Sequence, residues 1–146
     1  MTPTLPEILN GVVVAIAEPP APEAAGEFAA GRFGVIAMLS MLAAQEADRG
    51  PAAAVWENAA VRELCARSAS AYDEGLGGVL AQAAAVTDGD GGLTALTAAN
   101  AALRRALIAL HEAAETRGDH ALDRELLALY GEMARRRRLE LPVQAG

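Results

Sequence analysis

The chain has 146 residues, which is enough for one domain with a hydrophobic core that needs neither disulfides nor metal. Hydrophobic residues make up 53% of the chain but aromatic residues only 3%, which argues against β-rich folds, because sheets favour aromatic and β-branched side chains. The formal net charge of -7 argues against a nucleic-acid binder, since phosphates require a cationic surface. We therefore expect a soluble all-α protein with a single domain over residues 1–146.

The sequence also predicts a cytoplasmic protein. Cys65 is the only cysteine, so the chain forms no internal disulfide, and an inert buried thiol is expected. The apolar segment 8–17 follows Glu7 rather than a basic residue, which argues against a signal peptide. The longest apolar run, residues 33–44, is shorter than the roughly 20 residues of a membrane span. We expect no membrane association.

The first helix is predicted over residues 5–17. Thr4 and Glu7 have the spacing of a capping box, in which a hydroxyl and a carboxylate satisfy the free amides of the first turn. Three prolines should end this helix, since proline removes a backbone donor: Pro19, Pro20 and Pro22.

A second helix is predicted over residues 23–48. It is apolar on nearly all sides between residues 33 and 44, so we expect it to be the most buried helix. Arg49-Gly50-Pro51 predicts a helix end and a restart, with a third helix over residues 52–70 whose core face is ambiguous.

The middle of the chain is rich in glycine. Residues 72–78 predict a break or kink, followed by a short helix over residues 79–86. Residues 87–92, Thr-Asp-Gly-Asp-Gly-Gly, predict an exposed flexible loop, after which Thr94 should cap the next helix.

The clearest pattern is a helical hairpin at residues 95–135. The first helix, residues 95–117, has a seam with alternating steps of four and three: Leu96, Asn100, Leu103, Leu107, Leu110 and Ala114. Gly118 and Asp119 predict a tight turn, and a second helix follows with its own seam, Leu122, Leu126, Leu129 and Met133, widened by Leu127 and Tyr130. Together these elements predict a bundle of five to six helices with a C-terminal antiparallel hairpin.

Asn100 is the polar residue of an apolar seam. A buried amide must find hydrogen-bond partners, and in coiled coils it fixes register and oligomeric state at some loss of stability. We assign Asn100 this specificity role in preference to ligand binding. On this interpretation, replacing Asn100 with Leu should raise the melting temperature.

Titratable residues gather around the hairpin turn. His111 and Glu115 form an i, i+4 pair, and Asp119, His120 and Asp123 follow the turn, so a metal or acid/base cluster is conceivable there. The Glu-x-x-His and His-Glu-x-x-His motifs are absent, and polar turn residues are usually solvated. We therefore predict no metal, cofactor or catalytic residue.

Two further groups have alternative interpretations. The run Arg135–Arg138 would suit nucleic acid in isolation, but at a helix end it complements the negative end of the dipole, and docking of a protein partner is a second use. Phe33, Met38, Met41 and Leu42 are interpreted as core, or alternatively as the lining of an apolar ligand pocket, since methionine adapts to irregular shapes.

The segments Pro3–Leu9 and Phe28–Glu46, which include Arg32–Leu39, resemble a family of short uncharacterised all-α bacterial proteins. The family is encoded near acyl-CoA dehydrogenases and aminoglycoside-phosphotransferase-like proteins. Its corresponding helix reads Arg-x-Ala-x-Asn-x-Leu, and this chain departs from it at Met38, which replaces the Asn, and at residues 139–142. The resemblance covers about the first third of the chain. It implies an accessory role near acyl-CoA metabolism, with a partner enzyme, and no catalytic residues.

Three functions follow from these patterns, in order of preference. The first is a non-enzymatic interaction or accessory subunit that self-associates as a homodimer, because long Ala/Leu helices bury their faces best against further helices. The second is a binding module with an apolar pocket, between the helices at 23–48, 52–70 and 95–117, for an acyl chain or another small hydrophobic ligand. A catalytic bundle comes third, for want of converging titratable groups.

Overall fold

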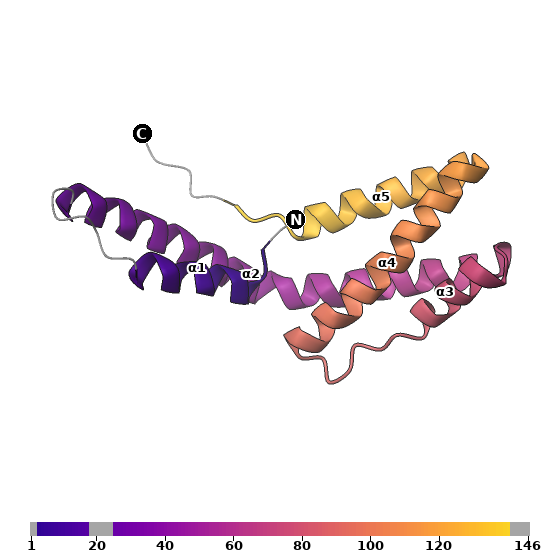
Figure 1. Ribbon diagram of the computed structural model, residues 1–146, viewed down its shortest axis with the longest axis horizontal. Helices are drawn as coiled ribbons and strands as arrows, with labels where there is room; N and C mark the ends of the chain where they lie inside the picture. The colour runs from indigo at the N-terminus through magenta and orange to yellow at the C-terminus, as the bar shows by residue number, and fades with distance from the viewer. Residues whose placement is uncertain (1–2, 18–24, 141–146) are drawn as a thin grey trace. The chain divides into compact units, whose positions relative to one another are not determined.

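The computed structural model describes residues 3–17 and 25–140, and within these ranges every regular element is a helix and none is a strand, which confirms the all-α prediction. In chain order they are α1 (Leu5–Ala17), α2 (Ala25–Ser68), the short 3-10 helix η2 (Ala69–Ala71), α3 (Glu74–Ala84), α4 (Leu93–Arg117) and α5 (His120–Arg136) (Figure 1). The predicted stop at prolines 19, 20 and 22 lies outside the described residues.

The chain forms two compact units that divide between Gly50 and Pro51. Unit 1 comprises residues 1–50 and 137–146, and unit 2 comprises residues 51–136. A single domain over the whole chain stays a prediction.

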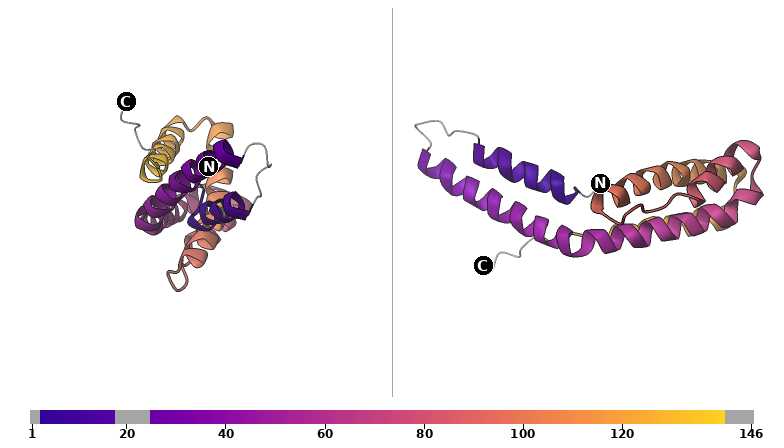
Figure 2. Two further views of the ribbon diagram at one scale, coloured as in Figure 1. Left: turned by 90° about the vertical axis from the view of Figure 1, so that its left-hand side faces the viewer. Right: turned by 90° about the horizontal axis from the view of Figure 1, so that it is seen from below.

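Unit 1 is built on an antiparallel pair of helices, α1 and the first part of α2, which lie side by side in Figures 1 and 2. The Arg32 Nε donates a hydrogen bond to the Ala15 carbonyl oxygen at 2.6 Å, near the end of α1. The predicted capping box is present, because the Thr4 amide donates to Glu7 Oε2 at 2.6 Å. That contact lowers the pKa of Glu7, since hydrogen bonds from Thr4 favour its charged form.

The segment after α5 returns to unit 1. The Gln45 Nε2 donates to the Glu140 carbonyl oxygen at 2.8 Å, and the Glu140 amide donates to Gln45 Oε1 at 2.8 Å. One side-chain amide thus satisfies both backbone groups of a residue 95 positions away.

The predicted helix boundary at Arg49-Gly50-Pro51 is wrong, because α2 continues through Pro51 to Ser68. Proline cannot donate to the carbonyl four residues earlier, so this helix continues without one of its bonds. Gly50 lies beneath the Glu46 carboxylate, and a Cβ added at Gly50 would approach Glu46 Oε1 to 2.4 Å. The Gly-Pro signal therefore marks the division between the two units rather than the end of a helix.

The expectation that the helix predicted over residues 23–48 is the most buried one is also wrong. Phe33 is 72% exposed, and Val35, Met38 and Met41 are exposed as well. A pair of helices has only one seam to bury, so a helix that is apolar on all sides keeps most of its surface outside. Among the described residues of unit 1, the buried apolar side chains are Ile8 and Ala43.

The hydrophobic core lies in unit 2, where α3, α4 and α5 pack with the part of α2 after Pro51 (Figure 1). Its larger fully buried side chains come from four helices: Val61, Leu64, Leu80, Leu103, Leu107, Leu110 and Leu126. Cys65 is buried in the same cluster, as predicted.

The predicted hairpin is confirmed as α4 and α5. All six predicted seam residues of α4 are buried, and Leu126 and Met133 are buried in α5. Gly118 ends α4 in the left-handed conformation, with φ 65°, and its amide donates to the Glu115 carbonyl oxygen. Leu127, which was expected to widen the stripe, is instead exposed.

By length and composition α4 is also the one described helix that could cross a membrane. Core helices of globular proteins pass the same test, and eight residues of α4 are buried within the protein.

The connections around α3 differ from the prediction in two places. Helix α3 begins at Glu74, so Gly75, Gly77 and Gly78 lie inside it; the carboxylate of Asp73 caps it by accepting from the Leu76 amide at 3.0 Å. A Cβ at Gly77 would lie 2.7 Å from the Ala69 carbonyl oxygen, so this close approach requires glycine. Helix α4 begins after Gly92, and the cap predicted from Thr94 is not formed.

Candidate functional site

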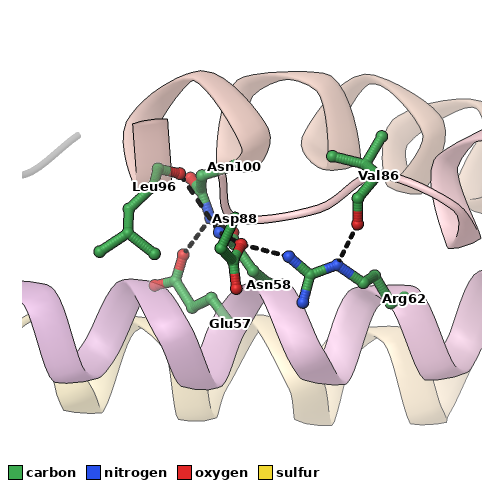
Figure 3. Close-up of polar contacts among 7 residues, drawn as sticks. All are labelled: Glu57, Asn58, Arg62, Val86, Asp88, Leu96 and Asn100. Carbon is green, nitrogen blue, oxygen red and sulfur yellow. Dashed lines mark hydrogen bonds and ion pairs between the residues drawn. The ribbon is translucent and has the colours of Figure 1, made fainter. Parts of the chain in front are cut away.

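Asn100 lies at the centre of a buried polar network between α2 and α4 (Figure 3). Its Nδ2 donates to Glu57 Oε2 at 3.0 Å and to Asn58 Oδ1 at 2.9 Å. Both partners belong to the same chain and both are fully buried. The polar seam position therefore aligns two helices within the molecule.

Asn58 extends this network to the loop after α3. Its Nδ2 donates to Asp88 Oδ1 at 2.7 Å and to the Leu96 carbonyl oxygen at 3.2 Å (Figure 3). The loop residue Asp88 also pairs with Arg62, whose Nε donates to the Val86 carbonyl oxygen at 2.6 Å. Residues 87–92 were expected to form an exposed flexible loop, and all of them except the half-buried Asp88 are exposed; Asp88 ties the start of this loop to α2.

Arg104 completes the network from α4. One of its terminal nitrogens donates to Glu57 Oε2 at 3.1 Å. Its Nε is buried and, among the described side-chain atoms, is the one buried polar atom without a hydrogen-bond partner. Two arginines thus face two carboxylates, and the network as a whole is close to neutral.

The network has the chemistry of a scaffold rather than of a catalytic site. Its carboxylates accept from amides and guanidinium groups of the same chain, and buried groups satisfied in this way fix one arrangement of their helices. Sequence reasoning found Asn100 but missed Glu57, Asn58 and Asp88. The spacing could have found two of them, because Glu57 and Asn58 lie four and three residues before the buried Val61 and therefore on the same face of α2.

A second cluster joins the two helices of the hairpin. His111 Nε2 lies 3.0 Å from Asp123 Oδ1 and 3.8 Å from Glu115 Oε1. The imidazole ring also packs on Tyr130, with 5.5 Å between ring centroids. Burial raises the pKa of the Tyr130 hydroxyl.

Two of the five turn residues considered from the sequence lie outside this cluster. The Asp119 carboxylate accepts from the Leu122 amide at 3.1 Å and so caps α5, and His120 is exposed. The sequence contained the right residues, but only the antiparallel packing of α4 and α5 selects Asp123 as the third member.

Unit 1 carries a set of exposed large apolar side chains, which we call the apolar surface of unit 1. Its members are Leu9, Val13, Val14 and Ile16 of α1 and Phe33, Val35, Met38 and Met41 of α2. Three of the four residues predicted as core or pocket lining belong to it, whereas the fourth, Leu42, is half-buried. Exposed side chains of this kind favour a contact surface over an enclosed pocket, and the ligand pocket stays a prediction.

The first two residues of the arginine run, at the end of α5, make contacts within the protein. Arg135 and Arg136 both donate to the Glu132 carboxylate, and the Arg136 guanidinium lies 4.1 Å from the centre of the Trp56 ring. These arginines lower the pKa of Glu132 to about 2. The arrangement suits the negative end of the α5 dipole, as the sequence suggested.

Comparisons with known protein families, with curated proteins and with solved structures give no match to this chain. The resemblance over residues 3–46 therefore stays a prediction, and the functional argument rests on the residues themselves.

Proposed function

We propose that the protein is a non-enzymatic interaction or accessory subunit that forms a homodimer through the apolar surface of unit 1. The observation that carries this proposal is the exposure of eight large apolar side chains on α1 and the first part of α2. Large apolar side chains that stay open to water in such number on one helix pair mark an interaction surface more often than a free one.

The described part of unit 1 also has little core of its own. Ile8 and Ala43 are its buried apolar residues within the described ranges, whereas unit 2 contains the remaining buried apolar side chains. Isolated short helices are marginal in water, and most helix stability comes from packing of an apolar face. A further layer over the apolar surface would supply that packing.

A second copy of the chain suits this surface best. No charged residue lies between Glu7 and Glu18, or between Arg32 and Glu46. Two acidic chains can therefore bring these helices together without placing like charges against each other in the interface. Two identical helix pairs that face each other about a two-fold axis form a four-helix bundle, the arrangement in which such helices bury the most surface. A lipid surface suits it less, because membrane-binding helices carry Lys or Arg beside their apolar face.

The test compares two exposed isoleucines. Ile16 in unit 1 is 60% exposed and Ile108 in unit 2 is 62% exposed, so Ile16→Ser and Ile108→Ser remove the same group from equally accessible positions. Isoleucine and serine have similar helix propensities, and both variants should fold. Sedimentation equilibrium of the full chain over micromolar concentrations measures the dimer dissociation constant.

We expect a dimer for the unmodified chain and for Ile108→Ser, and a dissociation constant raised roughly ten-fold or more for Ile16→Ser. Phe33→Ser, at the most exposed apolar position of unit 1, should have a similar effect. A monomer throughout the range would overturn the proposal, and so would a monomer that sediments with lipid vesicles. Equal weakening by Ile16→Ser and Ile108→Ser would place the interface elsewhere.

A further inference from the structure

We propose that His111, Glu115 and Asp123 form a binding site for a divalent transition metal ion such as Zn²⁺, which bridges α4 and α5. The three residues offer one imidazole nitrogen and two carboxylate oxygens, and these atoms lie within 4.8 Å of one another. This inference concerns unit 2 and is independent of the proposed dimer.

The closest pair already has the separation of two ligands on one ion. With metal–ligand bonds of about 2.0–2.2 Å, two adjacent ligands lie roughly 2.9 Å apart at a right angle and about 3.4 Å apart in a tetrahedron. His111 Nε2 and Asp123 Oδ1 are separated by 3.0 Å. Glu115 Oε1 lies 3.8 Å from the same nitrogen on an exposed side chain, so a small rotation brings it into range.

The charges also favour a cation. A single carboxylate is sufficient to accept the one proton that His111 Nε2 can donate, yet Asp123 and Glu115 both converge on this nitrogen. Two carboxylates that lie close together repel each other, and a divalent ion between them removes that repulsion. The imidazole ring also packs on Tyr130, and this contact limits the orientations that the first ligand can adopt.

The ligand types narrow the choice of metal. Imidazole with carboxylate suits Zn²⁺, Co²⁺ or Mn²⁺ better than soft ions, which prefer sulfur ligands. The only cysteine is buried in the core and belongs to another cluster. Three protein ligands leave further coordination positions for water.

The chain contains only two histidines, which makes proton NMR of the full protein a direct test. Addition of Zn²⁺ should shift the imidazole resonances of His111, with saturation at one ion per chain, while those of the exposed His120 stay in place. The variants His111→Gln and His120→Gln assign the two sets of signals. Isothermal titration calorimetry with Zn²⁺ then gives the affinity of each variant.

We expect Asp123→Asn and Glu115→Gln to weaken Zn²⁺ binding on the order of ten-fold or more. The matched controls are His120→Gln and Glu112→Gln, which alter an exposed histidine and an exposed glutamate on the same two helices, and they should bind as the unmodified chain does. The proposal is overturned if Zn²⁺ up to millimolar concentration leaves the His111 signals unshifted. It is also overturned if Asp123→Asn binds with unchanged affinity.

Discussion

Replacement of Asn100 with Leu tests the buried network most directly. The apolar seam of α4 suggests from sequence that leucine should stabilise this position. The structure predicts the opposite, because Asn100 donates to a fully buried carboxylate on Glu57 and to the buried amide oxygen of Asn58.

The magnitude follows from the two bonds. A hydrogen bond to a charged group contributes about 1.5–3 kcal/mol, and one between neutral groups contributes about 0.5–1.5 kcal/mol. The upper ends of these ranges apply here, because each acceptor would be left buried without its partner. Burial of leucine and its better helix propensity offset about half of this loss. We expect Asn100→Leu to lower the free energy of unfolding by about 2 kcal/mol, and the melting temperature by on the order of 5–10 °C.

Circular dichroism during thermal and urea unfolding measures this change. Thr97→Leu introduces the same residue at an exposed position of α4 and should change stability by less than about 0.5 kcal/mol. In a double-mutant cycle, Glu57→Leu with Asn100→Leu should cost less than the sum of the single changes, because the partners are removed together. A melting temperature for Asn100→Leu equal to or above that of the unmodified chain would refute the reasoning.

Three further predictions concern acid stability, the thiol and the hairpin turn. Arg135 and Arg136 hold the pKa of Glu132 at about 2, below its unfolded value near 4.5. The ion pairs of Glu132 therefore stabilise the fold above about pH 4.5 and lose their effect as the pH falls toward 2. The difference in urea midpoint between Glu132→Gln and the unmodified chain should vanish over that pH range. Burial raises the pKa of the Cys65 thiol, so a thiol reagent at pH 8 should label it far more slowly in native protein than in urea; equal rates would contradict its place in the core. Gly118 has φ 65°, a backbone conformation that strains other residues, so Gly118→Ala should lower stability by about 1 kcal/mol in urea unfolding, whereas the exposed helical Gly131→Ala should raise it slightly.

The hairpin could be predicted from the sequence because its signals are local. The seam of α4 has six positions with a regular spacing, and Gly118, which ends α4, lies two residues before the start of α5. Such patterns depend on helix geometry alone, so they remain valid whatever the rest of the chain does.

The polar network and the metal cluster could be predicted only in part, because they depend on packing between distant residues. Asn100 and Glu57 are 43 positions apart, and a buried glutamate cannot be told from a solvated one until its helix face is known. Pro51 was misinterpreted for a related reason. A Gly-Pro pair usually ends a helix, but here the helix continues and the pair lies where the two compact units divide.

The return of the chain to Gln45 has a consequence for biosynthesis. Glu140 pairs with Gln45 through both backbone groups, so unit 1 is assembled from residues that lie 95 positions apart in the chain. At about 5–20 residues per second, Gln45 leaves the ribosome several seconds before Glu140 is made. During that interval α2 lacks its contact with Glu140, and the exposed apolar side chains of α1 and α2 are already open to other proteins in the cell.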